Sequence, residues 1–507
     1  MIKRLGLWFA LSLALAACRR PLSPPPLVGV DAQHYDLAVW LDPAAQGFQA
    51  RLVLDVHHPD TLAQLPLAFE ALAVDSVWVN SVGAAARHED GRLWVPLEEG
   101  RRNSRIKVAY RGWPRVGFGT ARHGPQQVVY TDSWPDEGRG WLPGLHHPAD
   151  PATFTLRLTL PRGYEAVASG TLRSLDTLGA EVRYHWQLDV PVPIYAFAFA
   201  VADFSVTEDA VGDTLPVRYY MLAEDSAQAV QLRRTPQVLR FFSERFGPYA
   251  FGGYASVQVP MRFAGMENAA ASFLLADLFS TNQAEEVQVH ELAHQWFGNR
   301  VPIGDWADLW LSEGTATYLT TLFYEHADGL DEARRRWVDM AALVSRPTTP
   351  TPLVVAEPLS PSAILTWVPY DKGASVLHLL RRTLGDEAFF AALRATYQRY
   401  AGLPLSTTAF QEMLEAASGR DLDAVFRYWV YGNDFPTLKT HWDPATRTLS
   451  WQIDGAAGTL AGVPFALQVR QRSRLLYADA EAGSVTLTGW DDHRPRVRPV
   501  GVMIRIE

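Results

Sequence analysis

Hydrophobic and polar residues alternate along the early part of the chain. The alternation is clearest in the segments 35–41, 106–110, 154–160 and 182–188, where every second residue is apolar. A period of two gives a β-strand one buried face and one solvated face. Glycine, proline and aspartate separate the runs and mark turns. We therefore predict an antiparallel β-sandwich over residues 28–207.

The period of the apolar positions lengthens beyond this region. Apolar residues recur at helical spacing in the segments 226–246, 285–297, 315–326, 331–343, 374–384, 386–400, 408–417 and 421–431. Such spacing places apolar side chains on one face of a helix. Residues 208–436 are therefore predicted to form a mainly α-helical domain that is entered through a few strands.

Alternation with a period of two returns beyond Pro436, in segments such as 449–453 and 465–469. This return predicts a small β-domain over residues 437–507. The expected fold class is thus a multidomain α+β protein. With 507 residues, of which 48% are hydrophobic, the chain can bury several cores.

The first residues predict export. Lys3 and Arg4 precede an apolar run that is too short to span a bilayer, and the run ends at Cys18, the only cysteine. Residues 1–17 are expected to be a signal peptide, and the proline-rich residues 18–27 a tether. The small residues before Cys18 resemble a bacterial lipobox, which implies a lipid-anchored envelope protein, periplasmic or at the surface. An ordinary signal peptide with an incidental cysteine is the alternative.

The charge balance narrows the possible partners. The formal net charge is -9, whereas phosphate binding needs clustered positive charge. Nucleic acid is therefore not expected as a partner. The oligomeric state is left open, because interfaces leave no readable pattern in one sequence.

A His-Glu-x-x-His pattern is the strongest chemical signal in the chain. His290 and His294 are four residues apart, so on a helix both imidazoles lie on one face and can reach one metal ion. Glu291 lies beside them and can hold a water molecule. A surface helix with two incidental histidines is the alternative.

A third candidate ligand follows in Glu313. This carboxylate lies in the apolar run Trp310-Leu311-Ser312-Glu313-Gly314 at the start of a later helical segment. A buried carboxylate is costly without a cationic partner, and a catalytic zinc takes three protein ligands. Read alone, Glu313 could instead be an exposed residue at a helix start.

Together these motifs resemble those of the M1 family of zinc aminopeptidases, in the gluzincin branch. The resemblance includes Gly265-Met266-Glu267-Asn268, the 290–299 segment, the 308–314 segment and Tyr370-Asp371-Lys372-Gly373-Ala374, in the family's order. It implies a thermolysin-like catalytic domain, one zinc ion held by His290, His294 and Glu313, and peptide substrates with a free amino terminus. The short segment after Pro436 implies a short form without the large helical carboxy-terminal domain.

The resemblance also implies roles for individual residues. Glu291 would be the general base and Tyr370 would donate a proton to the oxyanion. Glu267 would bind the substrate ammonium, within a substrate-binding motif that includes Gly265, Met266 and Asn268.

Two departures from the family pattern change the expected substrate site. The usual motif has Gly-Ala before Met, whereas here the order is Ala264-Gly265, and Phe263 would then form the floor of the first side-chain pocket. Asp132 is a candidate for a second ammonium-binding group. A zinc endopeptidase and a non-catalytic peptide-binding or scaffold protein remain alternatives to the aminopeptidase.

Overall fold

The computed structural model describes residues 22, 27–70, 72–124, 126–344, 351–355, 360, 364–433, 435–455, 463–469, 472–478, 482–488, 495–499 and 505–506. Cys18 and the predicted signal peptide lie outside the described residues, as does most of the predicted tether. Among the described residues, no helix is long and apolar enough to cross a membrane.

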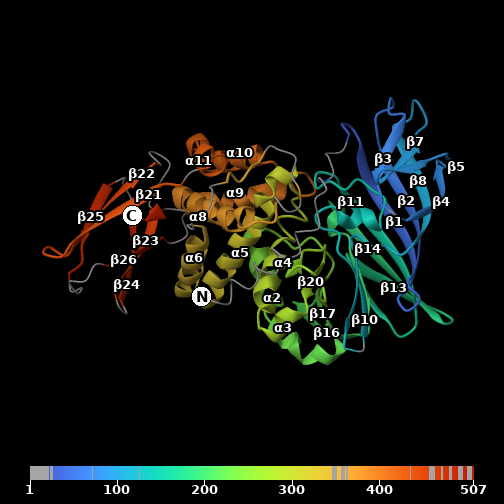
Figure 1. Cartoon of the computed structure of the whole chain (residues 1–507), viewed down its shortest axis with the longest axis horizontal. Coiled ribbons are helices and arrows are strands. Elements are labelled where there is room, and N and C mark those ends of the chain that lie inside the picture. The colour runs from blue at the N-terminus through green and yellow to red at the C-terminus, as the bar shows by residue number, and fades with distance from the viewer. Residues whose placement is uncertain are drawn as a thin grey trace. The chain divides into compact units, whose positions relative to one another are not determined.

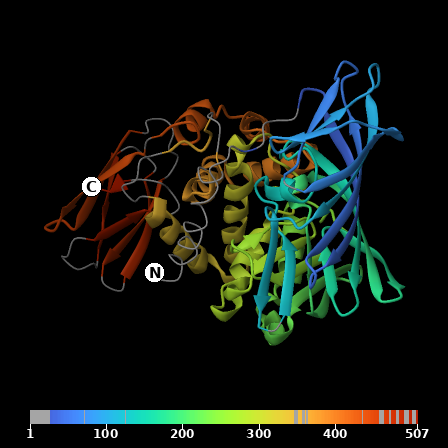
Figure 2. The ribbon, with the colours of Figure 1, turned by 45° about the vertical axis from the view of Figure 1, so that its right-hand side comes forward.

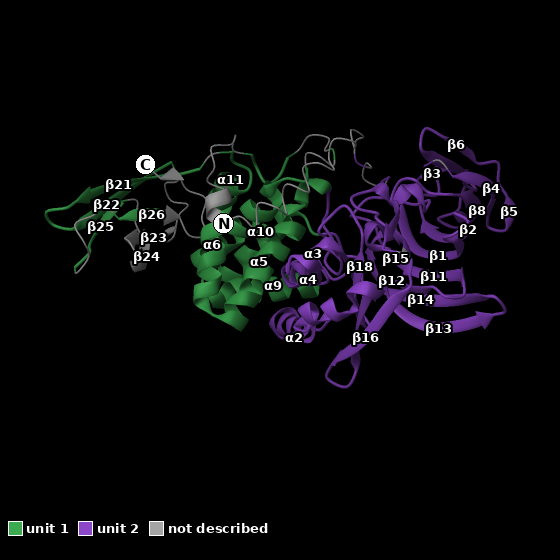
Figure 3. Ribbon diagram, turned by 60° about the horizontal axis from the view of Figure 1, so that its bottom comes forward, with its two compact units in different colours: residues 1–2, 306–399, 405–507 green, residues 3–305, 400–404 purple. Residues whose placement is uncertain are grey.

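The chain divides into two compact units (Figure 3). We call residues 3–305 and 400–404 the amino-terminal unit, and residues 1–2, 306–399 and 405–507 the carboxy-terminal unit. The return of 400–404 to the amino-terminal unit is anchored by the Gly402 amide, which donates to the Arg300 carbonyl at 2.7 Å. The predicted domain boundaries at 207/208 and 436/437 stay predictions, because this division runs through the predicted catalytic domain.

A large sheet dominates the first part of the amino-terminal unit (Figures 1 and 2). Its strand order is β13-β14-β11-β1-β2-β8-β4-β5. The strands are β1 (Asp31–Asp42), β2 (Gly47–His57), β4 (Ala73–Val79), β5 (Val82–Gly83), β8 (Asn103–Gly112), β11 (Pro151–Pro161), β13 (Thr171–Leu178) and β14 (Glu181–Pro193). All pairs are antiparallel except β1 with β11. The predicted alternation is confirmed in β1, where Tyr35, Leu37 and Val39 are fully buried.

Two smaller sheets accompany the large one. One has the order β12-β15-β10-β9, formed by Glu165–Ala168, Phe199–Ala202, Gln126–Thr131 and Phe118–His123. The other joins β3 (Gln64–Ala68), β7 (Arg92–Pro96) and β6 (Arg87–Glu89). Aromatic side chains fill the core between strands, as where Phe154 stacks on Phe197 with ring centroids 4.4 Å apart. The predicted amino-terminal β-sandwich is confirmed.

A five-stranded sheet leads into the helices of the same unit. Its order is β16-β17-β18-β20-β19, formed by Phe204–Val211, Leu215–Leu222, Tyr254–Val259, Ala271–Leu275 and Gly265–Met266. The helices are α2 (Thr235–Phe246), α3 (Asp277–Ser280) and α4 (Ala284–Ala293). The single helix predicted over 226–246 was wrong, since η4 (Ala223–Leu232) is a 3₁₀ helix that ends before α2. Pro236 explains the break, because proline fits the first turn of a helix and not its interior.

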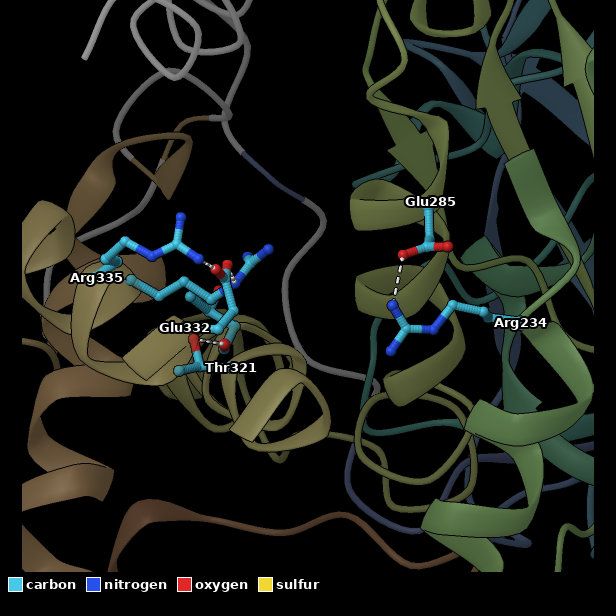
Figure 4. Close-up of polar contacts among 7 residues, drawn as sticks. Arg234, Glu285, Thr321, Glu332 and Arg335 are labelled. Carbon is cyan, nitrogen blue, oxygen red and sulfur yellow. Dashed lines mark hydrogen bonds and ion pairs between the residues drawn. The ribbon is translucent and has the colours of Figure 1, made fainter. Parts of the chain in front are cut away.

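The carboxy-terminal unit begins with helices. They are α5 (Trp310–Asp328), α6 (Leu330–Val344), the π-helix η6 (Val368–Lys372), α8 (Gly373–Leu384), α9 (Asp386–Arg399), α10 (Thr407–Ser418) and α11 (Asp423–Trp429). Arg381 of α8 joins three helices by binding Glu325 of α5 at 3.1 Å and Asp386 of α9 at 2.8 Å. Along α6, Arg335 reaches Glu332 (Figure 4).

Two small sheets follow the helices. One orders β25-β22-β21-β27, formed by Ala482–Thr486, Thr448–Asp454, Thr437–Asp443 and Arg505–Ile506. The other orders β24-β23-β26, formed by Arg472–Ala478, Val463–Val469 and Arg496–Pro499. The change from helices to strands near Pro436 confirms the predicted small β-domain, and with it the α+β class.

Candidate active site and metal centre

Helix α4 and the residue that caps its end, His294, carry the His-Glu-x-x-His pattern in the amino-terminal unit. Glu285 and Glu286 lie in its first turn, where the helix dipole favours negative charge. The Arg234 guanidinium points at Glu285 and binds it at 3.2 Å, which joins the start of α4 to the residue before α2 (Figure 4). The beginning of the helix is thus fixed, and its buried end carries the chemistry.

The two histidines bring their Nε2 atoms close together. The Nε2 atoms of His290 and His294 are 3.1 Å apart, and His294 is almost fully buried. The Nδ1–H of His294 donates to the Phe297 carbonyl at 3.2 Å, which leaves Nε2 to act as a ligand. Two nitrogens at 2.0–2.1 Å from a tetrahedral zinc are about 3.3 Å apart. The pair therefore fits a zinc ion.

Two predicted functional carboxylates lie beside this pair. Ligand atoms of Glu267, Glu291 and His294 all lie within 4.8 Å of one another. Both glutamates are buried, with 4% and 6% exposure. The structure thus brings the predicted ammonium anchor, the predicted base and one predicted metal ligand together, although they come from different elements.

Two amide side chains hold the Glu267 main chain against the histidine segment. Asn299 Nδ2 donates to the Glu267 carbonyl at 2.6 Å, and Gln295 Nε2 donates to it at 3.1 Å. Gln295 also accepts from the Ala270 amide at 2.9 Å. Sequence reasoning included both residues in the family motif and gave them no role. The sequence offered one signal for such a role: two amide side chains, Gln295 and Asn299, follow shortly after the metal-binding pattern.

The short strand β19 carries Gly265 and Met266. It pairs with β20 through Gly265 opposite Leu274 and Met266 opposite Phe273. Met266 and Asn268 are buried. At Gly265 a Cβ atom would lie only 2.2 Å from Glu291 Oε1, so β19 and the predicted base are in direct contact.

Arg262 contacts both Phe263 and Asp132. The guanidinium lies 4.4 Å from the centre of the Phe263 ring, and its Nε binds Asp132 Oδ2 at 2.8 Å. Arg262 also binds Glu137 at 3.0 Å. Burial raises the pKa of Asp132 to about 6, and the neighbouring Arg262 opposes that rise. Asp132 thus has a cationic partner within the chain, and its predicted role in binding the substrate ammonium stays a prediction.

Glu313 and Tyr370 belong to the carboxy-terminal unit. Glu313 is buried in the first turn of α5, and Tyr370 is half-buried in η6. Helix α5 meets η6 and the first residue of α8 at two glycines, since a Cβ at Gly314 would lie 2.8 Å from Gly373 Cα and 2.9 Å from the Pro369 carbonyl oxygen. This backbone crossing ties the turn after Glu313 to the segment that carries Tyr370.

Lys372 secures the end of η6. Its Nζ donates to the Thr351 carbonyl at 2.7 Å and to the Gly432 carbonyl at 3.3 Å. Burial lowers the pKa of Lys372 to about 8. The lysine therefore acts here as a structural donor two residues from Tyr370.

Comparison with known proteins places these residues in a family. Residues 230–429 match the model of the peptidase family M1 domain. Glutamyl aminopeptidase of Rattus norvegicus is 25% identical over 364 residues, which are 66% of this chain and 38% of the relative. Probable aminopeptidase 2 of Sulfurisphaera tokodaii is 22% identical, over 73% of this chain and 50% of the relative. The chain thus spans half or less of these relatives' lengths.

Solved structures agree with the family match. A two-domain M1 zinc metallopeptidase mutant bound to L-tryptophan is 29% identical with a TM-score of 0.74, over 82% of this chain and 98% of that one. The M1 zinc metallopeptidase of Deinococcus radiodurans is also 29% identical, with a TM-score of 0.72 over 82% and 96%. The fold is shared as well by Legionella pneumophila aminopeptidase A, at 19% identity and a TM-score of 0.77 over 96% and 61%.

The histidine pair, the adjacent buried carboxylates and these matches point to one conclusion. The chain carries a peptidase family M1 domain at residues 230–429, and its metal is zinc, as in the M1 zinc metallopeptidases that it resembles.

Proposed function

We propose that this protein is an aminopeptidase that hydrolyses the first peptide bond of peptides. One observation carries the proposal: the Glu267 carboxylate lies within 4.8 Å of both the Glu291 carboxylate and a ring nitrogen of His294. A carboxylate so close to the base and a metal ligand can bind a substrate ammonium by a charge-assisted hydrogen bond. The peptide bond next to that ammonium then falls at the reacting centre.

The proposed zinc ligands are His290, His294 and Glu313. The Nε2 separation of the two histidines supports the first two. Glu313 is supported by its burial in the apolar first turn of α5, because a buried carboxylate needs a cation to offset the cost of its desolvation. Zinc, when bound, polarises the scissile carbonyl and lowers the pKa of its water.

The chain's own residues would carry the proton transfers. Glu291 takes a proton from the attacking water and delivers it to the leaving amine, a contribution typically worth about 10²- to 10⁴-fold. The Tyr370 phenol donates a hydrogen bond to the oxyanion, a contribution typically worth about 10²- to 10³-fold. Gly265, Met266 and Asn268 line the path of the substrate main chain, and Phe263 contributes to the first side-chain pocket.

Relatives support peptides with a free amino end as substrates. The relatives named above include aminopeptidases, and a Deinococcus radiodurans M1 zinc metallopeptidase mutant, 28% identical with a TM-score of 0.71, was solved with a Tyr-Ser-Ala substrate. A tripeptide of that kind offers the ammonium that Glu267 would bind.

One decapeptide in two forms tests the proposal against its alternatives. One form has a free amino end and the other an acetylated end, products are identified by mass, and Glu291→Gln is the control. We expect stepwise loss from the free form only, and a decrease of about 10²- to 10⁴-fold in the variant. Internal cleavage of both forms would indicate an endopeptidase. No cleavage of a panel of such peptides by the zinc-loaded protein would favour a non-catalytic binding protein.

The ligand assignment has a separate test in zinc content. Wild type and Glu313→Gln would be dialysed against a zinc buffer and analysed for bound zinc per chain. We expect weaker retention in the variant, because a neutral amide replaces an anionic ligand. Equal retention would remove Glu313 from the proposed set.

We also propose export and a lipid anchor at Cys18, on the sequence pattern before that residue. Expression in a bacterium with a labelled fatty acid should label the wild type and not Cys18→Ser. Label in neither protein would contradict the anchor.

A further inference from the structure

A buried threonine joins the beginnings of helices α5 and α10. Thr407 is the first residue of α10, and its hydroxyl donates to Asp308 Oδ1 at 2.7 Å. The same oxygen of Asp308 accepts from the Thr407 amide at 2.9 Å, and the Trp310 indole Nε1 donates to the Thr407 hydroxyl at 2.9 Å. Asp308 and Thr407 are 99 positions apart in the chain. We call Asp308, Trp310 and Thr407 the Thr407 cluster.

Charge and burial explain why the cluster forms. Asp308 ends the 3₁₀ helix η5 (Trp306–Asp308), and its carboxylate lies at the amino end of α10, where a free amide and the helix dipole favour negative charge. All three residues are buried, with 8% exposure for Asp308, 0% for Trp310 and 2% for Thr407. The Thr407 hydroxyl both donates and accepts, so its loss would deprive the buried Trp310 indole N–H of this acceptor.

The cluster surrounds the point from which the Glu313 turn starts. Asp308 and Trp310 are the chain neighbours of Leu309, whose carbonyl accepts from the Glu313 amide at 3.0 Å. Trp310 is also held by packing, because its ring meets Phe410 of α10 edge-on with ring centroids 5.9 Å apart. The main chain that presents Glu313 therefore begins at a residue that is tied to α10 on both sides.

We propose that Thr407 is a positioning residue for Glu313 and acts through Asp308 and Trp310. The inference rests on the proposed function, in which Glu313 is the third zinc ligand. A ligand that is already ordered binds a metal more tightly, because ordering it during binding costs conformational entropy. The Thr407 hydroxyl fixes the first turn of α5 to α10, and the Glu313 carboxylate is thereby held ready for the metal.

Zinc affinity tests the proposal without any peptide substrate, so a failure of the proposed peptidase activity would be recognised separately. The dissociation constant for zinc would be measured by competition with a chelator of known affinity. We expect about tenfold weaker binding in Thr407→Val, at the lower end of the usual cost of removing a group that orients a metal ligand. Thr407→Ser retains the hydroxyl and should stay within about threefold of wild type. Wild-type affinity in Thr407→Val, or an equal loss in Thr407→Ser, would overturn the proposal.

A buried threonine elsewhere in the carboxy-terminal unit supplies the matched control. Thr396 is fully buried in α9, and its hydroxyl donates to the Ala392 carbonyl at 2.9 Å within the same helix. Thr396→Val therefore also removes a buried hydroxyl, whereas it keeps the hydrogen bonds of the Thr407 cluster. Its zinc affinity should equal that of wild type. A loss as large as that of Thr407→Val would attribute the effect to general loosening of the helices and would contradict a role through Glu313.

A second background shows whether Thr407 acts through Glu313. Adding Thr407→Val to Glu313→Ala should change the zinc affinity by less than about threefold, because the two changes are coupled through one ligand. An equal loss in both backgrounds would overturn the proposal. Weaker binding in Glu313→Ala but not in Thr407→Val would contradict the positioning role alone. Wild-type affinity in Glu313→Ala would instead remove Glu313 from the proposed ligands, and the positioning role with it.

Discussion

Two glycines beside predicted functional residues meet different neighbours. In the amino-terminal unit, a Cβ at Gly265 would collide with the side chain of Glu291. In the carboxy-terminal unit, a Cβ at Gly314 would collide with main-chain atoms of Gly373 and Pro369. A side chain can rotate away from an added methyl group, whereas a backbone inside a packed helix crossing cannot. An added methyl group would therefore meet a movable side chain at Gly265 and a fixed backbone at Gly314.

The largest expected effect is on the helix crossing. Gly314→Ala should destabilise the protein by about 3 kcal/mol, at the upper end of the usual cost of overpacking, because α5 and η6 must separate. The melting temperature of Gly314→Ala is compared with that of Gly83→Ala, a control in which the added Cβ would meet nothing within 4 Å. Bound zinc should also decrease if Glu313 shifts with the turn. A melting temperature equal to that of the control would show that the crossing yields as easily as a side chain.

The next effect concerns the link between the Glu267 main chain and the histidine segment. Asn299→Ala should cost about 1–3 kcal/mol of stability, because it leaves a buried carbonyl with one donor fewer. KM should rise more than kcat falls, since the loop that carries Glu267 loosens. The exposed Gln228→Ala, which also removes a side-chain hydrogen bond, should stay within about 0.5 kcal/mol of wild type. Equal effects of the two variants would contradict a fixed Glu267 loop.

A smaller, pH-dependent effect is expected at Asp132. Its pKa rises from 3.8 to about 6 on folding, so the folded protein binds this proton more tightly than the unfolded chain. The contribution to stability is complete below about pH 3.8 and is lost as the pH rises through about 6. Relative to Asp132→Asn, the wild type should therefore lose about 1–2 kcal/mol across this window, with allowance for solvent screening at Arg262. Melting temperatures of both proteins between pH 4 and 7 measure it, and a constant difference would contradict it.

The smallest effect sharpens the comparison of the two glycines. Gly265→Ala should change stability by less than about 0.5 kcal/mol, because the carboxylate can rotate instead of the strand moving. A loss as large as that of Gly314→Ala would show that β19, and not Glu291, absorbs the added methyl group.

Much of the fold was predictable because it rests on short-range periodicity. The alternation in β1 and the helical spacing of α8 and α9 correspond to one face of each element being buried. The error at 226–246 arose where apolar spacing continues through Pro236, although the proline permits a helix only from its first turn. The contacts of Lys372 could not be predicted in the same way, because the Thr351 and Gly432 carbonyls that accept from it lie 21 and 60 positions away.

The sequence by itself determined the histidine pair and its helix, because residues four apart share a helix face whatever surrounds them. It also determined the glutamates and the tyrosine that follow in the family's order. Tertiary structure alone decided that Glu267 lies beside Glu291 and His294, that Asn299 holds the Glu267 carbonyl, and that Arg262 pairs with Asp132. Those contacts join residues 24 to 130 positions apart, and only packing brings such residues together.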